Sequence, residues 1–286
     1  MKRILSILLL CTVVIQGWAK EGFVDDSLKV DGYMRHFRVY LPKGMKVDAP
    51  LVIAAHGYGG HGVDHTVFRA ADRHGFAVCE PYGLRDTTDH PGWNVGYPMQ
   101  KGWKVNDVKF MCRLARYLQK EYQLSKDNCF FTGMSNGGEM CYLLAYTDQK
   151  VFRAIGSIAG LTMQWIYKSM TPVQHIPFLE IHGTEDRVSE WEGDPQNKGG
   201  WNPYLPVPIA VSTLVTHNRC VEEQRDTIVF PQSESQRKVV RHKYLGGKNN
   251  TEVWLYEVRG AGHSWFTDDM DTGEELWKFF SKYLVP

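Results

Sequence analysis

Hydrophobic positions along this chain repeat with two periods, one typical of buried strands and one typical of helices. Continuous apolar runs at residues 50–55, 76–80 and 151–161 predict strands that are buried on both faces. Residues 107–122 carry apolar side chains at helical spacing and lysines or arginines at other positions, which predicts a helix with one buried face. Strands that alternate with helices in this way predict an α/β fold, with a mostly parallel central sheet and helices on both faces.

The same patterns place the remaining elements. Strands at residues 27–30 and 33–41 are joined by Asp31-Gly32, a pair that favours a two-residue hairpin turn. Residues 222–237 are polar and are expected at the periphery. Further strands are expected at 129–132, 177–180, 239–245 and 251–258, and further helices at 66–74, 209–218 and 274–284. Because no internal repeat or linker divides the chain, we expect a single domain.

The N-terminus has the pattern of a secretion signal. Two basic residues precede an apolar run at residues 4–15, and residues 17–19 offer a small-x-small cleavage site. The apolar run is too short to form a transmembrane helix. We therefore expect residues 1–19 to be a cleaved signal peptide and residues 20–286 to form the mature domain, without membrane insertion, in the periplasm or outside the cell.

Charge and cysteine content exclude several classes of protein. The chain has 33 lysines and arginines against 32 aspartates and glutamates, without a basic block, so nucleic acid and anionic membranes are not expected partners. Five cysteines remain after residue 19, without C-x-x-C spacing, which argues against a disulfide framework or a zinc site. One disulfide bond remains open as an alternative.

The segment between residues 128 and 145 contains a G-x-S-x-G motif formed by Gly133, Ser135 and Gly137. An apolar run precedes the motif and a helix-like run follows it, so we expect a sharp turn between a strand and a helix. A serine that attacks a carbonyl group must project from such a turn, and the glycines on either side leave room for it. The motif alone is frequent, so a purely structural turn is the alternative until partners of Ser135 are found.

Two further groups follow predicted strands, in the chain order serine, acid, histidine. One strand runs into a loop that carries Glu185 and Asp186, and a later strand is followed by His263. Because the carboxyl ends of parallel strands share one edge of a sheet, we expect these side chains to meet Ser135 there. The order is typical of α/β-hydrolases, in which the serine is the nucleophile, the histidine the general base and the acid the group that orients the imidazole.

A glycine-rich loop, His56–Gly60, directly follows the predicted strand at residues 50–55. Backbone N–H groups of such a loop can approach a substrate oxygen closely. We expect the N–H groups of Tyr58 and of Asn136, the residue after the serine, to form the oxyanion hole. An ordinary flexible connection is the alternative interpretation of this loop. Nearby histidines do not have the spacing of a metal site, and we expect no metal.

Four short segments carry a family resemblance: His56-Gly57, Gly133-Met134-Ser135-Asn136-Gly137-Gly138, His182-Gly183-Thr184 with Asp186, and Gly262-His263 with Trp265. They resemble carbohydrate esterase family 1, and more closely its feruloyl esterase and polyhydroxybutyrate-depolymerase-like branch. The resemblance extends over roughly residues 27–286. It implies an exported α/β-hydrolase without metal or cofactor, and it places the catalytic acid on Asp186 rather than Glu185. Residues 187–191 depart from the more apolar pattern of that family, which puts the acyl pocket in question.

The resemblance favours a feruloyl esterase that releases hydroxycinnamate from feruloylated arabinoxylan through a Ser-His-Asp triad. A planar acyl group or a sugar ring stacks well on aromatic side chains. The candidates for such contacts are Trp93, Trp201, Tyr204 and Trp265. Each of these side chains could instead belong to the core.

Three other activities remain as alternatives. An acetyl-xylan esterase or a polyester depolymerase would use the same triad with a different pocket. A prolyl-peptidase-like activity is less expected, because no propeller-length segment precedes the hydrolase region. A secreted carbohydrate-binding protein on the same scaffold is an alternative of another class, but binding requires none of the three triad residues. The oligomeric state is left open.

Overall fold

The computed structural model describes residues 21–286, and the expected signal peptide at residues 1–19 lies outside this range. Ten strands of the described chain form one sheet, in the order β1-β2-β4-β3-β7-β8-β9-β12-β11-β10. Its strands are β1 (Gly22–Val30), β2 (Tyr33–Leu41), β3 (Leu51–Ala55), β4 (Ala77–Pro81), β7 (Cys129–Met134), β8 (Ala154–Ile158), β9 (Phe178–Gly183), β10 (Glu222–Ile228), β11 (Val239–Leu245) and β12 (Val253–Val258). A separate short pair is formed by β5 (Leu84–Arg85) and β6 (Pro91–Gly92).

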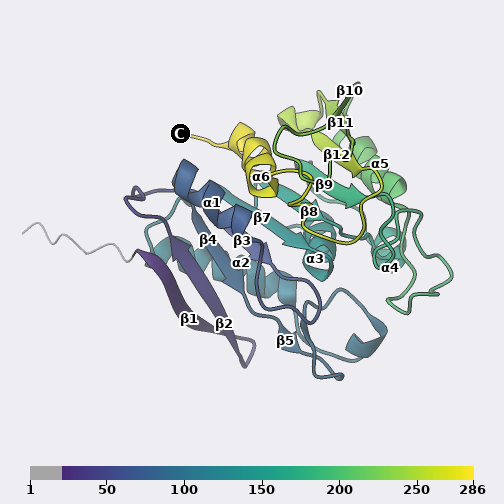
Figure 1. The fold of residues 1–286 in the computed structure, drawn as a ribbon. Coiled ribbons are helices and arrows are strands. Elements are labelled where there is room, and N and C mark those ends of the chain that lie inside the picture. Colours follow the sequence, from purple (N-terminus) through teal and green to yellow (C-terminus); the bar gives the residue numbers. More distant parts are fainter. Residues whose placement is uncertain (1–20) are drawn as a thin grey trace, which may run out of the picture.

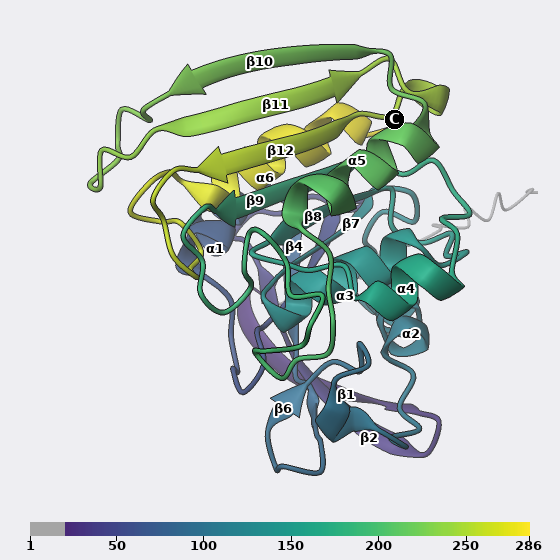
Figure 2. The same cartoon turned by 90° about the vertical axis from the view of Figure 1, so that its right-hand side faces the viewer.

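The centre of the sheet is parallel and both of its edges are antiparallel. Parallel pairing links β4, β3, β7, β8, β9 and β12. The hairpin β1–β2 pairs antiparallel with β4 at one edge, and β11 and β10 close the other edge. In Figure 2 the strands β12, β11 and β10 lie at the top of the molecule and β1 and β2 at the bottom. Because the central strands are parallel, their carboxyl ends all lie at the same end of the strands.

Helices cover both faces of the sheet (Figure 1). The helices are α1 (His65–His74), α2 (Asp107–Glu121), α3 (Asn136–Ala145), α4 (Gln164–Ser169), α5 (Val207–Asn218) and α6 (Thr272–Phe280), with short 3-10 turns at Pro98–Gln100, Lys248–Asn250 and Ser281–Tyr283. Helices α1 and α6 pack against each other on one face and share one hydrophobic core, whereas α2, α3 and α5 contribute to a second core. Every residue of α3 is buried, so this helix lies at the centre of the fold.

The predicted α/β-hydrolase arrangement in a single domain is confirmed, and most expected elements are present. The hairpin β1–β2 turns at Asp31 and Gly32, whose φ angles of 50° and 88° are the left-handed values that a two-residue turn of this kind requires. Helix α1 ends at Gly75, which adopts φ 73° and donates its N–H to the carbonyl of Ala71.

Three expected elements differ from the structure. The polar segment 222–237 contains the edge strand β10; its side chains are almost all exposed, so it lacks the apolar alternation that would have predicted a strand. The strand expected at residues 151–161 is limited to β8, at residues 154–158. The strand expected at 177–180 continues as β9 to Gly183, so His182 lies within the strand rather than in the following loop.

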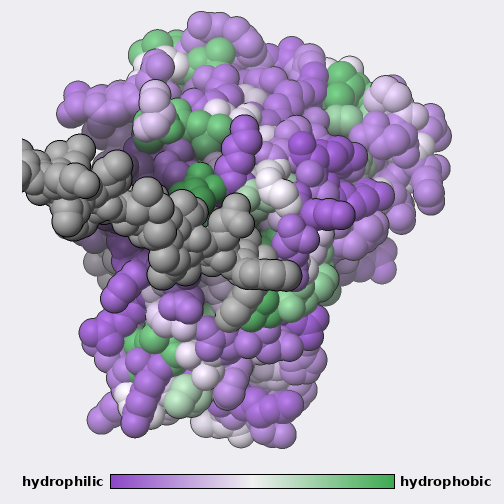
Figure 3. Space-filling model, turned by 90° about the vertical axis from the view of Figure 1, so that its left-hand side faces the viewer, coloured by the Kyte–Doolittle hydropathy of each residue, from purple (hydrophilic) through white to green (hydrophobic). Residues whose placement is uncertain are grey.

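Within residues 21–286, none of the helices has the length and apolar character needed to cross a bilayer. The face seen in Figure 3 is mostly hydrophilic, with hydrophobic residues in separate small groups. All five cysteines between residues 21 and 286 are free, so the disulfide bond left open by the sequence is not formed among them.

A buried ion pair connects the N-terminal hairpin to the helical layer. Arg35 of β2 and Asp107 at the start of α2 are joined by an Nη2–Oδ1 distance of 2.6 Å, and their side chains are at most 2% exposed. The second carboxylate oxygen of Asp107 accepts the backbone N–H of Asn94 at 2.7 Å. The pair therefore holds β2, α2 and the segment that follows β6 together.

Removing one partner should destabilise the fold strongly, because it leaves a buried charge without compensation. We expect Asp107→Asn to lower the free energy of unfolding by about 3–5 kcal/mol, measured by urea denaturation. As a control, Lys109→Ala on the same helix removes an exposed pair with Asp31, whose Nζ–Oδ1 distance is 2.5 Å, and should cost less than about 1 kcal/mol. Equal losses in the two variants would contradict the structural role of the buried pair.

Candidate active site

Ser135 lies in the turn between β7 and α3, as the motif predicts. Its backbone has φ 57° and ψ −119°, an unfavourable conformation for a residue with a side chain. The turn is held by the N–H of Ser135, which donates to the carbonyl of Ile158 at 2.8 Å. Because α3 begins at the next residue, Ser135 sits at the N-terminus of a helix, where free N–H groups favour negative charge.

Asp186 and His263 form a direct hydrogen bond, whereas Glu185 makes no such contact with the histidine. The distance from His263 Nδ1 to Asp186 Oδ2 is 2.7 Å. Since a carboxylate only accepts hydrogen bonds, Nδ1 carries the proton and Nε2 is left as the basic nitrogen. The other oxygen of Asp186 accepts the N–H groups of Val188 and Ser189, each at 2.8 Å. The carboxylate is therefore fixed by the loop that follows β9.

The loop at residues 56–60 is held in place by His56. This imidazole donates from Nδ1 to the carbonyl of Gly57 at 2.7 Å and accepts the N–H of Gly83 on Nε2 at 2.9 Å. Burial lowers the pKa of His56 to about 4, so the ring stays neutral and keeps this tautomer. The N–H groups of Gly59 and Gly60 donate to backbone carbonyls, which fixes the loop on the C-terminal side of Tyr58.

Ser135 and His263 line the same pocket, which has a volume of about 190 Å³. The other lining residues are Tyr58, Tyr97, Glu139, Leu161, Val188, Ser189 and Trp201. The rings of Tyr58, Tyr97 and Trp201 contact one another, with centroid distances between 5.1 and 5.7 Å. The structure thus brings one predicted aromatic residue, Trp201, to the pocket with the serine and the histidine.

The other three aromatic candidates lie elsewhere. Trp93 is fully buried and donates its indole N–H to the carbonyl of His56 at 2.8 Å, so it supports the loop rather than lining the pocket. Tyr204 is 1% exposed, and its hydroxyl accepts the N–H of Glu190 at 3.2 Å. Trp265 is half-buried and packs against the core on the α1 and α6 face of the sheet.

Asn136, which we expected only through its backbone N–H, also has a structural side chain. Its amide pairs with the backbone of Trp93 by accepting the N–H at 2.7 Å and donating to the carbonyl at 3.2 Å. Because the Trp93 indole in turn holds His56, the first residue of α3 is linked to the loop that carries Tyr58. The two expected oxyanion donors therefore belong to one hydrogen-bonded unit.

Glu139 is a pocket residue that the sequence did not single out. It lies one helical turn after Ser135, is 1% exposed, and accepts the side-chain N–H of Asn136 at 3.4 Å. Burial raises the pKa of Glu139 to about 7, although hydrogen bonds from Tyr97 and Asn136 partly stabilise its charge. The signal for this residue was its position, since it is the one acidic residue in a helix that is otherwise mostly apolar.

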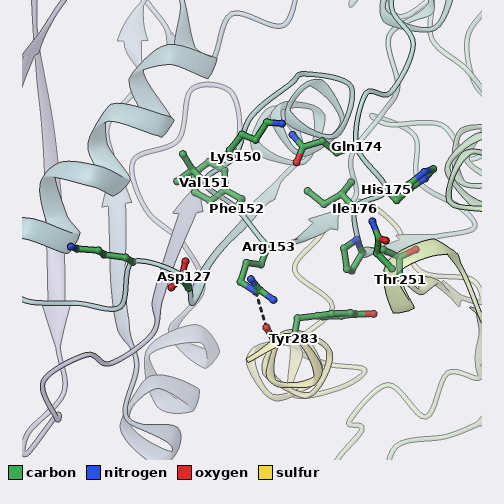
Figure 4. A pocket seen from close by; sticks show the side chains of 13 residues that line it. Asp127, Lys150, Val151, Phe152, Arg153, Gln174, His175, Ile176, Thr251 and Tyr283 are labelled. Atoms are coloured by element: carbon green, nitrogen blue, oxygen red, sulfur yellow. Dashed lines mark hydrogen bonds between the residues drawn. The ribbon is translucent and has the colours of Figure 1, made fainter. Parts of the chain in front are cut away.

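A larger pocket, of about 350 Å³, lies at the amino-terminal ends of the central strands (Figure 4). Its lining includes Asp127, Arg153 and Pro177, which lie one or two residues before the starts of β7, β8 and β9. Arg153 points toward Tyr283 and donates to its carbonyl at 3.0 Å. Because parallel strands start at this pocket and end near Ser135 and His263, the two sites are separated by the length of the strands.

Comparison with known proteins identifies the family. The sequence profile of the prolyl oligopeptidase family matches residues 88–285, which is more than half of the chain. The chain belongs to the prolyl oligopeptidase family. This assignment agrees with the α/β-hydrolase fold and with the place of Ser135, Asp186 and His263 at the carboxyl ends of the strands.

Several relatives of this prolyl oligopeptidase family member are named as esterases. The chain is 21% identical over 268 residues to the bifunctional acetylxylan esterase/xylanase XynS20E of Neocallimastix patriciarum, covering 92% of this chain and 35% of that protein. It is 26% identical over 168 residues to a probable feruloyl esterase C of Aspergillus niger, covering 56% of this chain and 57% of that protein. The chain thus spans between about a third and six-tenths of the length of these curated relatives, whose names agree with the resemblance seen in the sequence.

A solved structure supports the fold. An acetyl xylan esterase from Aspergillus awamori superimposes with a TM-score of 0.60 at 13% identity, over 90% of this chain and 99% of that one. At this level of identity the likeness establishes the α/β-hydrolase fold of this prolyl oligopeptidase family member, and no more.

The raised pKa of Glu139 predicts a pH-dependent stability. The ordinary value is 4.5, so the folded state disfavours the ionised carboxylate, and this cost grows between pH 4.5 and about 7. We expect Glu139→Gln to leave stability nearly unchanged at pH 4.5 and to raise the free energy of unfolding by roughly 3 kcal/mol at pH 8.5. Thermal unfolding at both pH values measures the difference.

Glu121→Gln is the matched control, because Glu121 is an exposed residue at the end of α2. This variant should follow the wild type at both pH values. A stabilisation of Glu139→Gln that is the same at pH 4.5 and pH 8.5 would contradict the ionisation argument.

Proposed function

We propose that this protein is a serine carboxylic ester hydrolase that releases hydroxycinnamoyl groups, such as ferulate, from plant cell-wall xylan. The observation that carries the proposal is the pocket itself. Ser135 and His263 face a space with aromatic walls, and the hydrogen bond from His263 to Asp186 leaves Nε2 as the basic nitrogen. Export through residues 1–19, expected from the sequence, would bring the enzyme to such a polymer.

These residues provide a chemical group for each step of acyl transfer. Ser135 Oγ attacks the ester carbonyl while His263 Nε2 takes the hydroxyl proton, and the carboxylate of Asp186 stabilises the imidazolium. The N–H groups of Tyr58 and Asn136 would hold the negative oxygen of the tetrahedral intermediate, close to the N-terminus of α3. His263 then returns the proton to the leaving sugar hydroxyl, and water releases the acyl group by the same route.

The shape of the pocket favours a large planar acyl group. Its volume of about 190 Å³ equals roughly six water molecules at about 30 Å³ each, which is more than an acetyl group fills. The three rings of Tyr58, Tyr97 and Trp201 provide flat apolar surfaces. Glu139 and the hydroxyl of Tyr97 add a polar side to the same pocket, which suits the phenolic hydroxyl of ferulate.

Acetyl-xylan ester hydrolysis is the second candidate. It is favoured by the name of the Neocallimastix relative, whose alignment includes nearly the whole of this chain. The catalytic groups would be the same, and a short acyl group would leave the aromatic part of the pocket to a sugar ring. A polyester depolymerase is a further variant of this chemistry.

Loss of the nucleophile provides the first test of the proposal. Ser135→Ala should lower kcat for methyl ferulate on the order of 10⁴-fold or more, because the attacking oxygen is removed. Circular dichroism and thermal unfolding serve to show that the variant is folded. Ester hydrolysis that survives this substitution would overturn the assignment of Ser135 as the nucleophile, whereas a wild type that hydrolyses no ester would favour a binding protein on the same scaffold.

Acyl specificity provides a separate test. The kcat/KM for methyl ferulate should exceed that for p-nitrophenyl acetate and for a short hydroxybutyrate ester, relative to their uncatalysed rates. Trp201→Ala should lower kcat/KM for ferulate roughly tenfold and affect acetate less, since it removes one wall of the acyl pocket. Trp265→Ala, outside the pocket, should leave the ratio unchanged. A preference for acetate in the wild type would move the function to the second candidate.

A further inference from the structure

A second histidine lies behind the acid of the proposed triad. His182, in β9, is fully buried, and its Nε2 lies 3.7 Å from Asp186 Oδ2, the same oxygen that accepts the hydrogen bond from His263. On its other side, His182 Nδ1 lies 2.9 Å from Oε1 of Glu180, which is also fully buried. Two imidazoles therefore face one carboxylate oxygen, and a second carboxyl lies beyond.

The hydrogen bonds of His182 restrict where its protons can be. Nε2 lies 2.8 Å from the carbonyl oxygen of Ser189, which can only accept, so Nε2 carries a proton. Nδ1 faces Glu180, and one further proton must lie between these two groups. The pair is therefore either an imidazolium with a carboxylate or a neutral imidazole with a carboxylic acid.

Charge decides between the two states. Within the described part of the chain, every ion pair of Glu180 and Asp186 is with a histidine. A buried carboxylate without a compensating cation is costly. Burial raises the pKa of Glu180 and by itself would lower that of His182. At His182 the hydrogen bond and the charge of Glu180 outweigh burial and raise the pKa, with a smaller contribution from Asp186, which in the neutral state would have no cation on this side. The imidazolium places its positive charge where both carboxylates need it.

We propose that His182 is a positioning residue of the triad: an imidazolium, held by Glu180 and the carbonyl of Ser189, that keeps Asp186 ionised and oriented toward His263. The proposal rests on the assignment of Ser135, Asp186 and His263 as the catalytic groups. It extends the array to Ser135, His263, Asp186, His182 and Glu180. His182 touches neither the substrate nor the serine in this arrangement and acts through Asp186.

Three other titratable groups around this array remain neutral near pH 7. Tyr142 and Cys141 of α3 face Glu180, and burial raises the pKa of each well above its ordinary value. Tyr204 faces Asp186, and burial raises its pKa to about 12. Glu139 differs from these groups: it lines the pocket with His263, and burial raises its pKa to about 7, so it changes charge within the pH range of the profile, in the wild type and in the variants alike.

The positive charge of His182 has a consequence for the base. It opposes a second positive charge on His263 and so favours the neutral imidazole that accepts the serine proton. Glu180→Gln should neutralise His182 without moving it, because the new amide can donate to Nδ1 while Nε2–H still binds Ser189. His263 then gains a proton more readily, and the acidic limb of kcat/KM should move up by roughly half to one pH unit.

The experiment that tests this role of His182 combines the pH profile of kcat/KM with a spectroscopic measurement that needs no substrate. In protein labelled with ¹⁵N-histidine, NMR should show both ring nitrogens of His182 protonated from pH 5 to 9 in the wild type, and one of them in Glu180→Gln. His182→Gln should shift the acidic limb in the same direction as Glu180→Gln. The control is Glu274→Gln, which removes the partner of the surface residue His74, with an Nε2–Oε2 distance of 3.0 Å, and should leave the profile unchanged.

A neutral His182 at pH 7 in the wild type would overturn the proposal. A fall in kcat with an unmoved acidic limb of kcat/KM in both variants would overturn it too, because that is the result expected if His182 has a purely structural role. If the wild type hydrolyses no ester, the proposed function fails, while the NMR titration still decides the charge of His182. The two failures are therefore distinguishable.

Discussion

The site depends on how tightly the Ser135 turn packs against the end of β3. Added Cβ atoms on Gly133 and Gly137 would collide with backbone atoms; at Gly133 the nearest, the carbonyl of Gly137, would be 2.6 Å away. The carbonyl of Ala55 lies against both glycines. Because the loop at residues 56–60 continues directly from β3, this contact sets the distance between the serine and that loop. The unfavourable backbone of Ser135 persists because strands on both sides hold it.

Polar groups beneath this turn extend the same constraint to the rest of the site. The amide of Asn136 binds the backbone of Trp93, and the Trp93 indole binds the carbonyl of His56. These bonds are buried, so breaking any of them would leave unsatisfied groups at a cost of about 1–3 kcal/mol each. The segment that carries Trp93 is anchored further away by the buried pair of Arg35 and Asp107. The segment that carries Trp93 therefore connects the buried ion pair of Arg35 and Asp107, which stabilises the fold, to the loop that lies beside Ser135.

The sequence predicted the fold and the placement of Ser135, Asp186 and His263 near one another at the carboxyl ends of the strands, because both depend on local patterns. Buried parallel strands read as apolar runs, and the turns at their carboxyl ends carry the motifs. The sequence could not show which aromatic residues line the pocket. Trp93 and Trp201 are the same residue type, and only the packing of the chain buries Trp93 and places Trp201 in the pocket wall. The sequence prediction missed β10 because an edge strand exposed on both faces has no apolar period. From the residues alone Glu185 and Asp186 were equivalent; the end of β9 and the turn after it aim Asp186 at His263.

Three buried carboxyls lie close to Ser135 and His263, and each is stabilised in a different way. Asp186 accepts two backbone N–H groups and the Nδ1 proton of His263. Glu180 shares a proton with His182. Glu139 has only neutral hydrogen-bond partners, and burial raises its pKa to about 7. A fold selected for stability alone would replace such groups with apolar side chains of similar volume. Their concentration around one serine is better explained by a need to place charge at defined positions, and the stability that this arrangement costs is recovered in the two hydrophobic cores on either side of the sheet.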